Sequence, residues 1–309
     1  MFASALNAAA ERSEWVQWLV ASASIAAMET RAFLGTAFGN IRAAKQNSVA
    51  VRLRKGDASQ IEATIHELVA YELLRRLQLR PVFELQLQGK TPDLLFETAG
   101  MRFISDVVVI HSPLKTVGDL DDGTGEAWDR AEPSESRADK IAKALQAKAD
   151  SYAELDLPIV PIVFLGDRYA FDFGDIEKAC FGITLEEVFL EPSFPESLPK
   201  FRVPVGGLLL PREDLPVPCE NISAVIACDW FDTLNRHNRG KRLASRVLHR
   251  WSVRQLLPVK AFDPLPQVCW DPTSSGGWKP RFTTEPNLVL QFLDADQIRM
   301  GLYSANAPW

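Results

Sequence analysis

Apolar positions recur at helical spacing near the start of the chain, where the residues are also rich in alanine and free of proline up to about residue 48. Helical periodicity without a helix breaker predicts helices. We therefore predict a helical N-terminal extension over residues 1–56, in which the stretch 47–55 favours a short strand. The positions that carry the helical pattern are Trp15, Leu19, Ile25 and Met28.

A stronger helix is predicted over residues 60–80, where isoleucine and leucine repeat every three to four positions. Asp57 and Ser59 precede it and are candidate N-caps, because their side-chain oxygens can accept hydrogen bonds from the free amides of a first helical turn. Pro81 ends this helix, since proline cannot continue the helical hydrogen-bond ladder.

Three strands, a loop, a helix and a strand follow. Residues 82–88 alternate between apolar and polar side chains, and residues 93–110 are typical of a hairpin of two strands. The polar and acidic stretch 117–135 predicts a loop. Residues 136–155 then predict a helix, and the apolar run 157–166 predicts a buried strand.

The order helix, three strands, helix, strand predicts an α/β core with a mixed sheet flanked by helices. We place this core at residues 57–170. Residues 171–309 are predicted to form a C-terminal α/β extension packed on the core, with a helix at 175–190 and a buried strand at 222–228.

The composition favours a soluble globular protein, with 309 residues of which 47% are hydrophobic and 24% are charged. The apolar stretch 15–27 is too short to span a bilayer, and Glu11 and Glu14 stand where a signal peptide carries positive charge. We expect a cytoplasmic protein without a membrane partner, and a secreted protein is the alternative. The sequence gives no indication of the oligomeric state.

The four cysteines and four histidines show no spacing typical of metal ligands, such as CxxC or HExxH. A zinc site and a disulfide framework are therefore not predicted. Reduced cysteines packed in a cytoplasmic protein are the favoured interpretation.

Two aspartates at the edges of apolar runs are the main candidates for chemistry. Asp106 lies within the strand that ends the 93–110 hairpin, and Asp93 begins the partner strand. A buried carboxylate is costly unless it is paired, hydrogen-bonded or bound to a metal ion. Two carboxylates held together raise each other's pKa unless a cation joins them. Mg²⁺ suits such a pair, because it accepts one or two carboxylates with waters and substrate phosphates.

These residues resemble the PD-(D/E)XK nuclease superfamily, which has the restriction-endonuclease-like fold. Pro92 and Asp93 correspond to the PD element, Asp106 to the acid of (D/E)XK, and Glu67 to the acid of the first helix. The resemblance spans roughly residues 60–166. It extends to bacterial members of the superfamily that carry a lysine-rich helix before a turn, and that turn here contains Tyr152, Leu155 and Pro158.

The resemblance implies a nuclease that hydrolyses phosphodiester bonds with Mg²⁺ or Mn²⁺ held by Asp93, Asp106 and Glu67. Val108 departs from the pattern, because it stands where the family has its lysine. That lysine stabilises charge on the phosphate, which needs only an ammonium group within reach. Lys148 on the 136–155 helix is the first candidate to replace it, and Lys90 is the second.

Structural roles for the same residues remain open. Asp93 can cap the turn before its strand, and Asp106 can pair with Arg102 on the same strand face. Glu67 can be a solvated helix residue. A chain that has lost its chemistry and binds nucleic acid or protein is therefore the alternative to an active nuclease.

A basic segment near the C-terminus is the candidate nucleic-acid contact. Its arginines recur every four residues and would make one positive stripe on a helix, suited to the phosphates of DNA, while two of them would still share a face on a strand. Pairing with acids elsewhere in the protein is the equally weighted alternative. The four residues are Arg242, Arg246, Arg250 and Arg254.

Overall fold

The structure is a computed structural model of the whole chain. It describes residues 1–110, 137–165, 173–186, 201–204, 207–210, 219–230, 242–250, 259–263, 265–272, 274, 278–282, 288–291 and 300–302. The predicted loop at 117–135, together with His111 and Arg254, lies outside the described residues.

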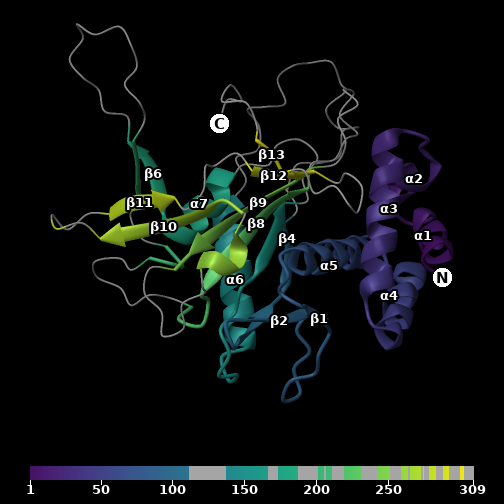
Figure 1. Cartoon of the computed structure of the whole chain (residues 1–309), viewed down its shortest axis with the longest axis horizontal. Helices are drawn as coiled ribbons and strands as arrows, with labels where there is room; N and C mark the ends of the chain where they lie inside the picture. The colour runs from purple at the N-terminus through teal and green to yellow at the C-terminus, as the bar shows by residue number, and fades with distance from the viewer. Residues whose placement is uncertain are drawn as a thin grey trace, which may run out of the picture.

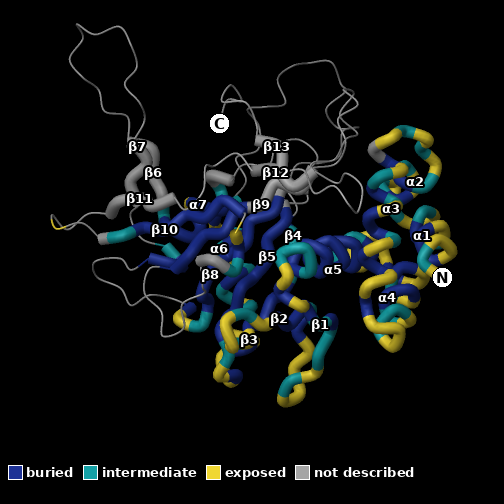
Figure 2. The backbone as a smooth tube through the Cα atoms, in the orientation of Figure 1, coloured by how far each residue is buried: buried dark blue, intermediate teal, exposed yellow. Residues whose placement is uncertain are grey.

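The N-terminal residues form the predicted helical extension. Its helices stand side by side at one end of the molecule, in purple in Figure 1, and expose their outer faces in Figure 2. In the described residues no helix is long and apolar enough to cross a membrane. The four helices are α1 (Phe2–Ala10), α2 (Glu14–Ala21), α3 (Ile25–Asn40) and α4 (Ala43–Lys55).

Two details of this extension were predicted wrongly. The stretch 47–55 belongs to α4 rather than to a strand, because Val49, Ala50 and Leu53 are buried together at helical spacing. Ile25 and Met28 do not continue the buried stripe: their exposed fractions are 70% and 48%. A new helix begins at this point, capped by the hydroxyl of Ser24, so the helical phase that ran through Leu19 is lost.

Helix α5 (Ala58–Arg76) connects the extension to the sheet (Figure 1). It begins with the predicted Asp57 cap, in which the carboxylate accepts from the Gln60 amide and the Gln60 side chain accepts from the Asp57 amide. This reciprocal pair satisfies two of the free donors of the first turn. Most of the α5 side chains are buried, since α3, α4 and the sheet surround it.

The predicted hairpins follow in antiparallel order. The 82–88 strand is shorter than predicted, because the positive φ of Glu84 turns the chain out of β conformation. Ala99 and Gly100, both at positive φ, make the tight turn of the second hairpin. The strands are β1 (Val82–Phe83), β2 (Leu94–Thr98) and β3 (Met101–Ser105).

The chain continues from β3 into β4 (Val107–Ile110) with one residue, Asp106, between them. β3 pairs with β2, whereas β4 pairs in parallel with β5 (Ile162–Leu165). The predicted helix is α6 (Arg137–Ser151). The order of helix, strands, helix and strand is as predicted, except that the third predicted strand is divided at Asp106 into β3 and β4. The protein is a mixed α/β structure.

The C-terminal residues extend the same sheet through β5. β8 (Ala224–Trp230) pairs in parallel with β5, and the sheet continues through the pairing partners beyond it. The remaining strands are β9 (Arg242–His249), β10 (Gln267–Pro272), β11 (Trp278–Phe282), β12 (Leu288–Gln291) and β13 (Met300–Leu302), with the short helix η3 (Val259–Phe262).

The predicted 175–190 helix is only partly correct. α7 (Phe173–Phe181) ends at Gly182, whose positive φ closes the helix. The chain then forms β6 (Ile183–Glu186), which pairs with β7 (Phe201–Pro204). The β6–β7 pair is a separate two-stranded sheet.

Two hydrophobic cores lie on opposite sides of the two sheets, the β1–β2–β3 sheet and the larger sheet that contains β4 and β5. Phe96, Phe103 and Phe164 pack on the side of α5, and Ile104, Val108 and Ile110 pack on the side of α6 and α7. The alternation predicted for residues 102–110 is therefore present, with α5 and α6 on opposite faces.

Phe103→Ala should lower the free energy of unfolding by about 3–5 kcal/mol, as expected for a buried phenylalanine. Phe103 is fully buried and stacks on Phe96 with ring centroids 5.3 Å apart, so truncation leaves a cavity. Arg102→Ala, at the exposed neighbouring position, should stay within about 0.5 kcal/mol of the wild type. Urea denaturation of both variants tests this, and equal effects would contradict the assignment of the two faces.

Candidate functional site

Asp93 and Asp106 lie close together at the point where pairing with β2 ends and pairing with β5 begins. The backbone N–H of Asp93 donates to Oδ1 of Asp106 at 3.0 Å, and the N–H of Val107 donates to Oδ2 of Asp93 at 2.8 Å. The carbonyl of Asp106 already accepts from Ile162 on β5. The two side chains thus complete hydrogen bonds that the β2–β3 ladder no longer supplies. This geometry explains the carboxylate inside an apolar strand and brings both acids into one site.

Helix α6 provides a cation to Asp106, and the turn that follows the helix provides a hydroxyl. Nζ of Lys148 lies 2.7 Å from Oδ2 of Asp106, and the hydroxyl of Tyr152 lies 2.9 Å from both carboxylate oxygens. Lys148 lies in the last turn of α6, and Tyr152 is the first residue after the helix ends at Ser151. Asp106 is only 2% exposed, whereas the Lys148 side chain is 35% exposed. The ammonium group therefore bridges a buried acid and the surface.

Glu67 on α5 is buried beside the same acids, in an ion pair with Arg52 of α4. Nη1 of Arg52 donates to Oε1 of Glu67 at 2.9 Å, and Nη2 lies 2.7 Å from Oε2. The second contact is close enough for charge attraction but lacks hydrogen-bond alignment, so Oε2 is a buried oxygen without a hydrogen-bond donor. Nη2 also lies 2.8 Å from Oε1 of Glu84, just after β1.

The cluster contains more acid than its cations neutralise at short range. Burial raises the pKa of Asp93 to about 7, with repulsion from Glu67 and Asp106 adding to the effect, while the Val107 amide and Lys148 oppose it. Burial likewise raises the pKa of Glu67 in spite of Arg52. Burial alone would lower the pKa of Lys148, but attraction to Asp106 outweighs it and the pKa is raised. The site therefore favours a bound proton or cation.

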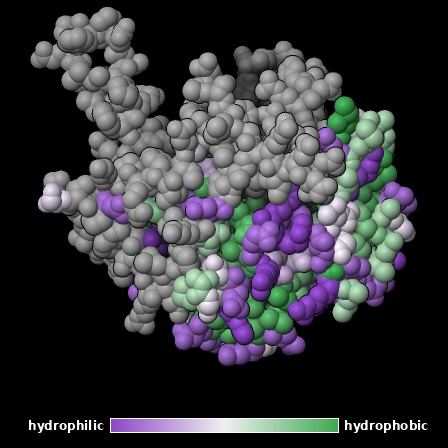
Figure 3. All heavy atoms as spheres, in the orientation of Figure 1, coloured by the Kyte–Doolittle hydropathy of each residue, from purple (hydrophilic) through white to green (hydrophobic). Residues whose placement is uncertain are grey.

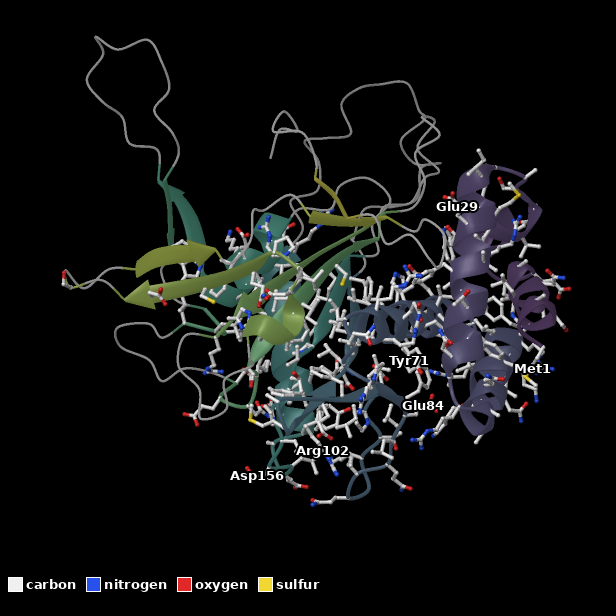
Figure 4. All side chains as sticks on the ribbon, viewed as in Figure 1. Met1, Glu29, Tyr71, Glu84, Arg102 and Asp156 are labelled. Carbon is white, nitrogen blue, oxygen red and sulfur yellow. The ribbon has the colours of Figure 1, made fainter. Side chains whose placement is uncertain are left out.

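The remaining candidates around the hairpin lie apart from this cluster. Lys90 is exposed on the turn before β2, and no hydrogen bond or ion pair joins it to Asp93 or Asp106 in the described residues. Arg102 is also exposed, opposite Glu97 on β2, and Figure 4 shows it at the outer end of the hairpin. The alternative pairing of Arg102 with Asp106 is thus not formed, and Lys148 takes that place.

The predicted arginine stripe is not an accessible helical surface. Arg242 and Arg246 belong to strand β9, and Arg246 is buried in an ion pair with Glu177. Arg250 is buried and donates to the carbonyls of Cys219 and Ile222. These contacts correct the nucleic-acid role predicted for Arg246 and Arg250, because their guanidinium groups are used inside the fold. Arg254 and the side chain of Arg242 are not among the described parts.

Two residues of the cluster were not predicted from the sequence as part of the site. Tyr152 could have been found, since it follows the helix that carries Lys148 and stands in the turn named in the resemblance. Arg52 had no comparable signal, because it lies in the stretch interpreted as a strand. Its pairing with Glu67 depends on how α4 packs on α5, which is a long-range feature of the fold.

The donor set was compared with what Mg²⁺ or Mn²⁺ requires. In the described residues no group of three or more His, Cys, Asp or Glu side chains is arranged to hold a metal ion. Mg²⁺ nevertheless often takes one or two carboxylates together with water and substrate phosphate. Asp93 and Asp106 are the candidate pair, whereas both carboxylate oxygens of Glu67 already contact the guanidinium of Arg52, at 2.9 and 2.7 Å. The residues therefore fit a cation held by two carboxylates.

Comparison with known proteins gives no assignment. No protein family, curated protein or solved structure matches the chain. The resemblance to PD-(D/E)XK nucleases therefore stays a prediction that rests on the residues and their geometry.

The stability of the metal-free protein should fall as the pH rises from about 4 to about 7. The folded-state pKa of Asp93, about 7, lies above the ordinary value of 3.8. The folded state keeps a proton in this window that the unfolded chain has lost, so the free energy of unfolding decreases with pH. Denaturation in EDTA across this range measures the effect, and Asp93→Asn should flatten it. An equal slope in wild type and Asp93→Asn would contradict the assignment.

Proposed function

We propose that this chain is a metal-dependent nuclease with a PD-(D/E)XK core, which hydrolyses phosphodiester bonds of nucleic acid. In this reaction water attacks phosphorus, and the P–O ester bond breaks to leave a phosphate monoester and a free hydroxyl. The observation that carries the proposal is the contact between Lys148 and Asp106, at 2.7 Å, beside Asp93. It supplies an ammonium group in place of the lysine that Val108 replaces.

The order and placement of the core elements support the same proposal. α5 carries Glu67, the hairpin carries Asp93 and Asp106, and α6 carries Lys148. α5 and α6 lie on opposite sides of the strands, and both Glu67 and Lys148 influence the pKa of Asp93. This is the arrangement that the resemblance implies, with the lysine provided by a helix instead of the strand.

In the proposed site Asp93 and Asp106 would hold Mg²⁺ or Mn²⁺, with Glu67 as a further acid. The cation would act as a Lewis acid on the phosphoryl oxygens. Lys148 would offset negative charge that develops on the phosphate, and its partial exposure leaves its ammonium accessible to a substrate. Tyr152 and the Asp93 amide would hold Asp106 in one orientation by their hydrogen bonds.

A second candidate function is a catalytically inactive nuclease fold that binds nucleic acid or protein. One observation favours it: Lys148, Tyr152 and the Asp93 amide already occupy both carboxylate oxygens of Asp106. A metal ion would have to share Asp106 with these donors. The two candidates differ in whether the purified protein cleaves any substrate.

Purified protein should cleave single- or double-stranded DNA or RNA in Mg²⁺ or Mn²⁺ and lose this activity in EDTA. Lys148→Ala should reduce the rate by about 10²–10³-fold, the loss typical of removing one preorganised charge stabiliser. Asp106→Asn, which keeps the shape of the side chain, should abolish cleavage. Gel assays with labelled oligonucleotides measure both effects.

Lys140→Ala is the matched control, since Lys140 lies on the same helix and makes no contact with Asp106 in the described residues. It should retain wild-type activity. Folded wild-type protein that cleaves none of the substrates would contradict the nuclease and leave the binding module. Equal losses in Lys140→Ala and Lys148→Ala would remove the special role of Lys148.

A further inference from the structure

A cavity of about 380 Å³ lies where α5 and β1 approach the N-terminal helices. Figure 4 shows Tyr71 and Glu84 at this junction, and Figure 3 shows hydrophilic side chains gathered nearby, where α5 lies between the sheet and the extension. The volume falls within the range of small-molecule sites, about 300–1,000 Å³. The residues that line it include Asn40, Arg42, Lys45, Tyr71, Arg80 and Phe83.

The lining of this cavity is basic. Arg42, Lys45 and Arg80 contribute three cationic side chains, and no lining residue is acidic. Arg42 and Arg80 are exposed, and neither forms an ion pair within the described residues. The cavity therefore presents two exposed guanidinium groups that have no ion-pair partner in the described part of the chain, and such groups suit bidentate contacts with phosphate oxygens.

The nearest acids do not cancel this charge. Glu84 lies 3.5 Å from Lys45, but the same carboxylate is also engaged by Arg52 at 2.8 Å. Glu72 accepts from the Asn40 side chain and is held by Arg75 and Arg76. Glu72 has its own cations, whereas Glu84 takes part of the charge of Lys45, so the positive excess at the cavity comes from Arg42 and Arg80.

The N-terminus of α4 adds an independent feature of an anion site. Arg42 is the N-cap residue of this 13-residue helix, its side chain makes no capping hydrogen bond, and the first turn contains no acid. The first amides of a helix lack internal partners and carry the positive end of the helix dipole. A phosphate group commonly binds at such an end.

We propose that this cavity binds a phosphate group of the nucleic-acid strand on which the protein acts. The inference rests on the proposed function for the choice of ligand, while the basic cavity itself stands on its own geometry. Arg42 and Arg80 would grip the phosphate oxygens, and the α4 amides and Lys45 would add to the positive field. The same chemistry would accept the phosphate of a free nucleotide, which the experiment below distinguishes.

The cavity is joined to the acidic cluster by a chain of charged contacts. Lys45 contacts Glu84, Glu84 contacts Arg52, and Arg52 contacts Glu67. The cavity and Glu67 thus share one network of charged side chains. The cavity would also provide a local basic patch for a polyanion on a chain whose net charge is −6. Arg246 and Arg250 do not provide such a patch, because they are buried.

The test measures binding of fluorescein-labelled single- and double-stranded DNA and RNA oligonucleotides to the full chain by anisotropy. EDTA is present, so cleavage does not interfere. Arg42→Ala with Arg80→Ala should weaken binding at least tenfold. It should also reduce the slope of log K against log salt by roughly two, because each lost phosphate contact removes about one unit. Arg42→Lys with Arg80→Lys keeps both charges and should retain most of the affinity.

The matched control is Arg54→Ala with Arg102→Ala, which removes two exposed arginines and the same charge away from the cavity lining. It should bind as the wild type does. Equal weakening in the control and the Arg42/Arg80 variant would overturn the proposal, as would wild-type protein that binds neither oligonucleotide nor nucleotide. If the variant with Arg42→Ala and Arg80→Ala does not fold, the variant with Arg42→Lys and Arg80→Lys is used instead. In that case, a slope of log K against log salt smaller than one for the wild-type protein would overturn the proposal.

Calorimetry with AMP and with inorganic phosphate separates the two sources of phosphate. Oligonucleotide binding that depends on Arg42 and Arg80 assigns the site to a strand. AMP binding with the same dependence, and no oligonucleotide binding, supports the phosphate site but assigns it to a free nucleotide. Binding is measured in EDTA without cleavage, so a failure of the nuclease proposal appears only in the cleavage assay and a failure of the cavity only in these measurements.

Discussion

The buried carboxylate of Asp106 and its partners are the interaction on which the candidate site depends. Before this residue the chain pairs with β2, and after it the chain pairs with β5. The regular hydrogen bonds between β2 and β3 therefore end here. Asp93 and Asp106 replace the missing contacts by bonding to each other's strand. A buried charge is stable only when it is paired and hydrogen-bonded, and Lys148 and Tyr152 supply both conditions. The residue at which the chain passes from pairing with β2 to pairing with β5 is therefore also the residue around which the charged side chains cluster.

The N-terminal extension belongs to the same electrostatic system. Arg52 reaches from α4 to Glu67 and Glu84, so the helical residues partly neutralise acids that belong to the core. In the described residues Arg52 is the cation that acts on Glu67, against the repulsion from Glu84 and Asp106. Through Arg52 and Lys45, the extension contacts both Glu67 of the acidic cluster and Glu84 beside the basic cavity.

The sequence predicts the local parts of this arrangement well. Caps, prolines and alternation give α5, the 93–110 hairpin, α6 and β5, and the aspartate inside an apolar strand marks the site. Lys148 could be nominated because α6 had to pack on that strand. The mixed α/β class also follows from this order of elements. The nuclease-like core itself stays a proposal, since no known protein matches the chain.

The misses have non-local causes. Val49, Val51 and Leu53 alternate like a strand, but α4 is fixed by packing Val49, Ala50 and Leu53 together. The arginines spaced by four suggested a helix, whereas pairing of β9 with β8 makes a strand and buries Arg246 against Glu177. Neither the packing of α4 nor the pairing of β9 with β8 can be predicted from the residues next to them in the sequence.

The central claim is that the Asp93–Asp106 pair holds a divalent cation next to Lys148. A crystal structure of the protein grown with Mn²⁺, with anomalous data collected at the manganese edge, tests it most directly. The account predicts an anomalous peak in contact with both carboxylates, and Lys148 still beside Asp106. An intact cluster in which Lys148 and Tyr152 occupy Asp106 and no peak lies at the pair would contradict it.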